Sequence, residues 1–109
     1  MSDENLAHLT AIAKSIGPWT PHPALTANQA TLRVVVFEAH GPPVHSHEVD
    51  ECYVVLDGEL VIEIEGRETV RLGPRQGFTV PRGVSHKTSA PVRTVILMVE
   101  PSGVVPTGD

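Results

Sequence analysis

Proline and glycine residues divide this chain into short segments, and their positions limit the folds that it can adopt. Ten prolines and nine glycines make up about one residue in six. The segments between them are rich in β-branched residues, which favours a succession of strands. The predicted strands lie at residues 31–38, 51–56, 60–65, 68–72, 77–80 and 94–99. Short strands joined by tight turns predict an all-β fold, a small antiparallel barrel or sandwich.

One helical pattern precedes the strands, at about residues 3–16. Apolar residues recur there every three or four positions, Ser2 or Asp3 is expected to cap the helix, and Gly17-Pro18 favours its end. The following connector is too dense in proline for regular structure, and Trp19 is expected to hold it across the domain. We therefore expect a single domain with four parts. These are a helical segment (1–17), a connector (18–30), a barrel (31–100) and a tail (101–109).

The charge balance limits the partners that this chain can have. Eight Lys and Arg residues against 13 Asp and Glu residues give a net charge of −5, which argues against binding a nucleic-acid backbone or an anionic membrane surface. The single cysteine, Cys52, excludes an internal disulfide. The N-terminus is acidic and the apolar runs are too short to span a bilayer, so a cytoplasmic protein is expected.

Histidine and glutamate residues gather in one stretch that can carry chemistry. His45 and His47 are two positions apart, so in an extended segment both side chains point to the same face. Glu51 can return a carboxylate towards them, and His86 follows a Pro-x-Gly turn at residues 81–83. Imidazoles and a carboxylate held together form a ligand set for a divalent transition metal with open coordination positions.

Two patterns in the chain resemble the two motifs of the cupin superfamily. The first is H-x-H-x3-E-x6-G over residues 45–58, and the second is P-x-G-x2-H over residues 81–86. The chain is most similar to small single-domain bacterial cupins, a group often labelled loosely as mannose-6-phosphate isomerase-like. It departs from the family pattern at Ala39, at Arg75-Gln76 and at Ala90, where the family has Gly, Gly-Asp and Asn. These departures lie in turns and at the rim.

The resemblance implies a cupin barrel, also called a double-stranded β-helix or jelly roll, with a short N-terminal helix. It assigns metal ligation to His45, His47, Glu51 and His86. One divalent metal per chain is expected, and Fe, Mn, Ni, Cu, Co and Zn all suit this ligand set. A small-molecule ligand or substrate and a homodimer are also implied.

Two further residues are candidates for proton transfer. Tyr53 shares a strand face with Glu51, so it is expected to face the cavity, and His40 is expected at the mouth of the barrel. Arg75, Arg82 and Lys87 are the basic residues near the second motif. They form no clear clamp for a phosphate, which argues against phosphosugar isomerisation.

A barrel of this size is expected to leave apolar strand faces that its own chain does not cover. Val54 with Leu56, and Ile96 with Met98, are the faces expected to point outward and to be buried by a second copy.

The sequence therefore predicts a metal-binding cupin, with three functions left open. The first is a metal-dependent enzyme acting on a small oxygenated metabolite, by dioxygenase, isomerase, lyase or hydrolase chemistry. The second is a non-catalytic module that binds or senses a small molecule. The third is a structural barrel that retains its ligand residues without using them.

Overall fold

The computed structural model of this chain describes residues 3–103 and shows a short helix followed by antiparallel strands. The elements are α1 (Leu9–Ser15), β1 (His22–Ala27), β2 (Ala30–His40), β3 (Glu51–Asp57), β4 (Leu60–Ile64), β5 (Val70–Leu72), β6 (Gly77–Val80) and β7 (His86–Pro101). Within the described residues, no helix is long and apolar enough to cross a membrane. The mostly antiparallel β architecture confirms the predicted fold class and fits a jelly-roll barrel.

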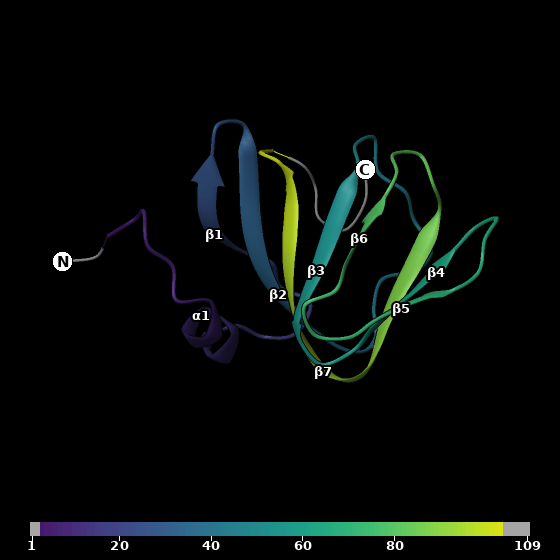
Figure 1. The fold of residues 1–109 in the computed structure, drawn as a ribbon, viewed down its shortest axis with the longest axis horizontal. Helices are drawn as coiled ribbons and strands as arrows, with labels where there is room; N and C mark the ends of the chain where they lie inside the picture. Colours follow the sequence, from purple (N-terminus) through teal and green to yellow (C-terminus); the bar gives the residue numbers. More distant parts are fainter. Residues whose placement is uncertain (1–2, 104–109) are drawn as a thin grey trace.

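The longest strand, β7, holds the barrel together because it belongs to both of its sides. The second half of β7 lies between β2 and β3, in the order β1-β2-β7-β3-β6. Its first half pairs instead with β4, which also pairs with β5. Figure 1 shows the two groups of strands curving towards each other, with β7 crossing between them. Residues near the start and the end of β7 can therefore face one interior.

Strand β7 bends at residues 91–93, where its pairing with β2 is irregular. The sequence predicts these residues to lie outside a strand. Phe37 of β2 pairs with Thr94, whereas Ala39 pairs with Ala90, so the register shifts over the exposed segment 91–93. A bulge that contains a proline bends a strand without ending it. The strand predicted at 94–99 is for this reason only the second part of a longer one.

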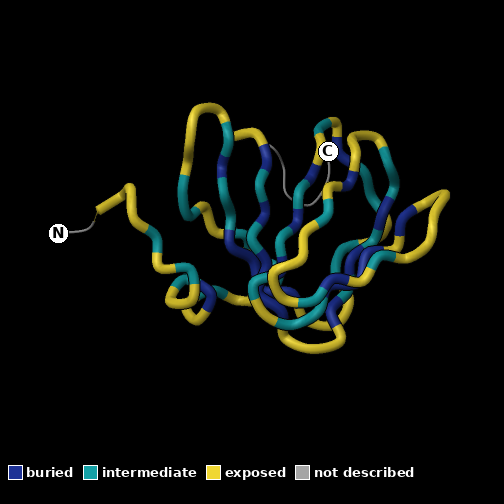
Figure 2. Tube along the Cα trace, viewed as in Figure 1, coloured by how far each residue is buried: buried dark blue, intermediate teal, exposed yellow. Residues whose placement is uncertain are grey.

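The two faces of β2 enter two different apolar clusters. Val35 and Phe37 point into the barrel interior, whereas Val34 and Val36 join a smaller cluster beneath α1. Alternate residues of the strand therefore serve two different parts of the core. Figure 2 shows buried residues concentrated where the strands converge and exposed residues along the outer turns.

The expectation that Ile96 and Met98 point outward is wrong. Both side chains are buried in the barrel interior, with 0% and 2% of their surface exposed. The strand is nearly continuously apolar, so its sequence does not distinguish the inner face from the outer one. The alternation places Leu97 on the outer face instead, half-buried against the cluster beneath α1.

The N-terminal part of the chain differs from the prediction in two places, because the connector contains a strand and the helix is shorter. A strand, β1, lies inside the connector, and it tolerates Pro23 because it is an edge strand with a register shift next to that residue. The helix begins only at Leu9, with His8 as N-cap and no side-chain cap. Asp3 accepts a hydrogen bond from the backbone N–H of Asn5 at 2.9 Å and does not cap the helix. Ser2 and residues 104–109 of the tail lie outside the described residues.

Gly58 closes the turn between β3 and β4 directly against β7. Its φ is +98°, and a Cβ at this position would lie 2.8 Å from the carbonyl oxygen of Arg93. The fully buried Thr94 hydroxyl bonds to both backbone groups of Glu59, donating to its carbonyl at 2.9 Å and accepting from its N–H at 3.0 Å. The turn and the bend of β7 are therefore fixed together.

We predict that Gly58→Ala destabilises the protein by about 3 kcal/mol or more, because it combines a positive φ with a backbone clash. Gly66→Ala is the matched control: Gly66 also has a positive φ of +83°, but a Cβ there would meet no atom within 4 Å apart from its chain neighbours. About 1 kcal/mol is expected there. Denaturant unfolding of both variants measures the difference, and equal losses would contradict the clash.

Candidate metal centre

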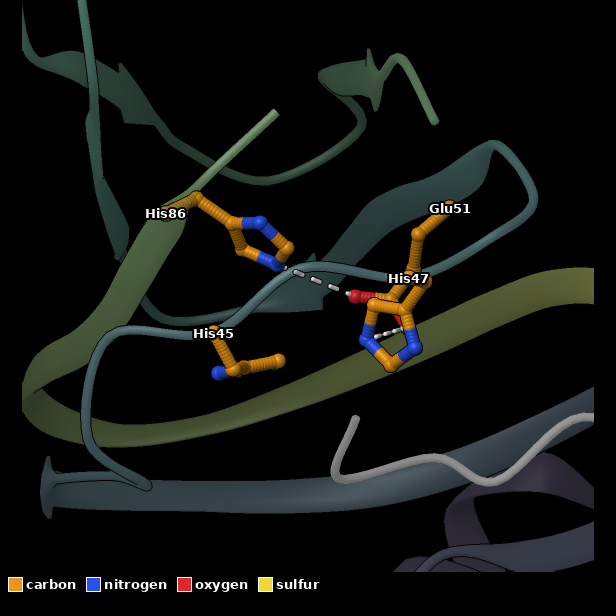
Figure 3. A group of neighbouring side chains, drawn as sticks. All are labelled: His45, His47, Glu51 and His86. Carbon is orange, nitrogen blue, oxygen red and sulfur yellow. Dashed lines mark ion pairs between the residues drawn. The ribbon is translucent and has the colours of Figure 1, made fainter. Parts of the chain in front are cut away.

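Four residues from three parts of the chain meet inside the barrel. His45 and His47 lie in the loop between β2 and β3, Glu51 begins β3, and His86 begins β7. Each offers one ligand atom, and these atoms all lie within 4.8 Å of one another. Figure 3 shows the three imidazoles and the carboxylate converging on one space. The structure thus brings together all four residues that the sequence predicted as ligands.

Backbone hydrogen bonds fix the two histidine-bearing segments to each other. The N–H of His45 donates to the carbonyl of His86 at 3.0 Å, and the N–H of His86 donates to the carbonyl of His45 at 2.9 Å. The N–H of Gly83 donates to the carbonyl of His47 at 2.8 Å. The Pro-x-Gly turn therefore holds the loop as well as directing His86, and the backbone that carries these histidines is fixed by the protein itself.

The ring nitrogens of two histidines are assigned by their carbonyl partners. Nδ1 of His45 lies 2.8 Å from the carbonyl oxygen of Pro43, and Nδ1 of His86 lies 3.0 Å from that of Val84. A carbonyl oxygen only accepts hydrogen bonds, so each Nδ1 carries a proton and donates it. In the neutral imidazole this leaves the lone pair on Nε2, the atom that can ligate a metal.

Glu51 lies at the centre of the group, with 1% of its surface exposed. Its two oxygens lie 3.0 Å from Nε2 of His47 and 3.4 Å from Nε2 of His86. The Tyr53 hydroxyl donates a short hydrogen bond to the same carboxylate. Burial, the charge and hydrogen bond of Glu51, and the charge of Glu100 raise the pKa of Tyr53 well above its usual value of 10.0. Tyr53 therefore keeps its proton and faces the site, as expected from the sequence.

Opposing effects act on the pKa of His86. Burial lowers it, but the hydrogen bond to Glu51, the hydrogen bond to Val84 and the negative charge of Glu51 together outweigh burial and raise it above 6.5. In the metal-free protein the imidazole therefore accepts a proton more readily than a free histidine does.

A second buried carboxylate, Glu100, was missed by sequence reasoning. Its side chain is fully buried, and it forms an ion pair with Arg33 at 2.6 Å. Arg33 shares the inner face of β2 with Val35, and the sequence alternation did show that. The pairing also requires the register of β2 against β7, which places Thr31 opposite Glu100, and no sequence signal gives that register.

Other basic or titratable candidates lie outside the group of four residues, although Arg82 lines a surface pocket with His47. His40 is exposed at the end of β2 and lines a surface groove with Glu38 and Arg71, so the structure does not bring it to the centre. Arg75 and Arg82 are exposed in turns. Neither forms a described ion pair with the site.

A small antiparallel barrel with three histidines and a glutamate converging in its interior defines the class of protein. The family model described as "Cupin domain" matches residues 32–100. The chain therefore belongs to the cupin family, as the sequence motifs predicted.

Individual proteins are similar to this chain in sequence or in fold. The uncharacterized protein YdbB of Bacillus subtilis (strain 168) is 37% identical over 73 residues, which cover 67% of this chain and 65% of that protein. A cupin-2 domain containing protein from Shewanella frigidimarina NCIMB 400 is 26% identical, with a TM-score of 0.74 over 79% of this chain and 83% of that one. Hydroquinone 1,2-dioxygenase PnpCD, in complex with Cd2+ and 4-hydroxybenzonitrile, is 18% identical, with a TM-score of 0.78 over 96% and 76%. This last likeness shows the fold alone.

We predict that His86 titrates above pH 6.5 in chelator-treated protein, followed by its ring proton signals in NMR. Because the folded state favours the protonated imidazole, His86 adds stability below the unfolded pKa of about 6.5, and this contribution disappears as the pH rises through the raised pKa. Metal affinity should change in the opposite sense and rise with pH, since the ligand must be deprotonated.

Glu51→Gln tests the cause of this shift. It removes the negative charge but leaves His86 buried, so the pKa of His86 should fall below that of the parent protein. An unchanged pKa in this variant would contradict the assignment to Glu51.

Proposed function

We propose that this chain is a metal-dependent enzyme that acts on a small oxygenated metabolite at one mononuclear centre formed by His45, His47, Glu51 and His86. The observation that carries the proposal is a buried set of three imidazoles and one carboxylate within 4.8 Å of one another, beside an apolar cavity that His45 and Tyr53 also line. A metal ligand set next to an apolar cavity is a common arrangement for catalysis on a small molecule.

The chemistry of the donor set supports a transition metal. Within residues 3–103, the ion pairs of Glu51 are with histidines only, whereas the buried Glu100 is paired with Arg33. A buried carboxylate whose partners are imidazoles is stabilised by a cation held among them. Imidazole nitrogen with carboxylate oxygen suits Fe, Mn, Ni, Cu, Co and Zn. Such an ion, when bound, supplies a Lewis acid that polarises a substrate oxygen.

The remaining residues have distinct roles in this proposal. Val84 and Pro43 hold the histidine rings with Nε2 turned inward. Tyr53 keeps its hydroxyl proton at the site and is the candidate proton donor to a substrate oxygen. The structural neighbour in complex with Cd2+ and 4-hydroxybenzonitrile is a barrel of similar fold with both a metal and a phenol. It shows that a barrel of this fold can hold a metal together with a small oxygenated molecule, and it sets neither the reaction nor the substrate.

We predict that the purified protein binds about one divalent metal per chain. His47→Ala should weaken metal binding by more than about 100-fold, because loss of even a hydrogen-bond partner of a metal ligand lowers metal affinity by about 10- to 100-fold. His40→Ala is the control, because that histidine is exposed and apart from the centre. Metal content by plasma mass spectrometry and calorimetric titration measure both. Equal metal content in the two variants would contradict the assignment.

Turnover then separates an enzyme from a binding module. Metal-loaded protein is assayed for oxygen consumption and against keto-acid, sugar, phenol and diketone panels, beside Tyr53→Phe. The enzyme proposal expects a turnover that requires metal and falls at least about tenfold in Tyr53→Phe with its metal content unchanged. Tight binding of a panel compound with no turnover would instead support the non-catalytic module.

We also propose that the chain forms a homodimer through the outer face of its sheet. Leu56 and Leu97 lie on this face next to the cluster beneath α1 and remain half-buried in the single chain. A second copy would remove them from water.

We predict a mass of twice 11.7 kDa by light scattering. Leu97→Glu should shift it towards the monomer, because the substitution places a charge on the apolar face. The exposed Val92→Glu, which lies on the bend of β7, is the matched control and should leave the mass unchanged. A monodisperse monomer for the parent protein would contradict the proposal.

A further inference from the structure

An apolar cavity of about 50 Å3 leads to the metal centre. His45 and Tyr53, which belong to the centre, form one wall of this cavity, and the apolar side chains of Trp19, Phe37 and Met98 lie around the rest. Its volume is small beside the 300–1,000 Å3 of ordinary ligand pockets. A molecule that reaches the centre by this route without displacing side chains is limited to a few atoms.

The lining also limits the charge of the ligand. Among the described residues that line the cavity, none is Lys, Arg, Asp or Glu, and the polar groups are those of His45, Tyr53 and Thr88. A carboxylate or phosphate placed there, away from the metal, would lose its hydration without gaining a cationic partner. A ligand group that occupies this cavity is therefore uncharged, apart from the atoms that bind the metal.

Trp19 is a fixed part of the cavity wall. Its backbone has a φ of +61°, and its N–H donates to the carbonyl of Val36 at 2.7 Å. Its indole N–H donates to the carbonyl of Glu38 at 2.9 Å, and its ring stacks on Phe37 with 4.1 Å between centroids. The edge of its six-membered ring lies so close to Gly41 that a Cβ there would be 2.5 Å from it. These contacts confirm that Trp19 holds the connector across the domain, and they leave the indole little room to swing away.

We propose that Trp19 is the specificity-determining residue of this centre. It restricts the site to ligands in which the metal-binding oxygens carry only a short, uncharged apolar group. This inference rests on the proposed metal site. It assigns the choice of substrate to a residue of the N-terminal connector, outside residues 32–100 that match the family.

The test uses two neutral chelators that share one metal-binding group, acetohydroxamic acid and benzohydroxamic acid, which carry a methyl and a phenyl group. Each is titrated into cobalt(II)-loaded protein and followed by the visible absorption of the cobalt, so that the readout does not depend on the single tryptophan. In the parent protein the phenyl compound is expected to bind at least about tenfold more weakly, because its ring does not fit beside Trp19.

Trp19→Leu is expected to reduce or reverse this preference, by about tenfold or more in the ratio of the two dissociation constants, because it shortens the wall but keeps an apolar contact with Phe37. Val92→Ala, an exposed apolar residue away from the cavity, is the matched control and should leave the ratio unchanged. The carboxylate-bearing succinic monohydroxamic acid should bind weakly to both the parent and Trp19→Leu, which separates charge from size.

Gly41→Ala supplies a second variant in case Trp19→Leu does not fold. A methyl group at this position clashes with the indole ring and forces it to shift. The binding of acetohydroxamic acid should therefore change by about tenfold at unchanged cobalt content. If both variants retain the parent ratio and affinity while cobalt is bound, the inference is wrong and the metal site stands. If cobalt is not bound, or neither chelator changes its spectrum in any protein, the proposed function fails with it.

Discussion

The burial of the Glu51 carboxylate is the constraint around which the interior of this barrel is arranged. A carboxylate removed from water is costly unless hydrogen bonds or a cation compensate it. For Glu51 the described partners are the Tyr53 hydroxyl and the imidazoles of His47 and His86. Glu100, buried near the end of β7, has the guanidinium of Arg33. Glu100 is compensated by a fixed protein cation, whereas the partners of Glu51 are groups that also ligate metals. This contrast makes Glu51, and not Glu100, the candidate ligand.

The long strand β7 makes this arrangement possible. It carries His86 at its start and Glu100 near its end, and the bulge between its two halves turns both towards one interior. The bend is in turn tied to the turn at Gly58 by the buried Thr94 hydroxyl. Contacts remote from the centre therefore contribute to its geometry, since β4 pairs with the first half of β7 and β3 with the second.

The sequence predicts those site residues that lie close together along the chain. His45, His47 and Glu51 lie within one short stretch, and alternation places them without knowledge of the fold. The inward position of Met98 and the pairing of Glu100 with Arg33 depend on strand register instead. Register follows from contacts between distant strands. The residues of an apolar strand such as the end of β7 therefore do not show by themselves which face points inward.

The position of Trp19 explains why a match to the family does not by itself identify a ligand. All four candidate ligands lie within residues 32–100, whereas the indole that narrows the cavity comes from the connector before them. The connector is held by backbone and indole hydrogen bonds to the carbonyl groups of Val36 and Glu38, which β2 provides whatever its side chains are. A change of residue at position 19 can therefore alter the size of the cavity without changing the donors at the metal. The candidate ligands and the residue that limits the size of the cavity are thus separable, because they belong to different segments of the chain.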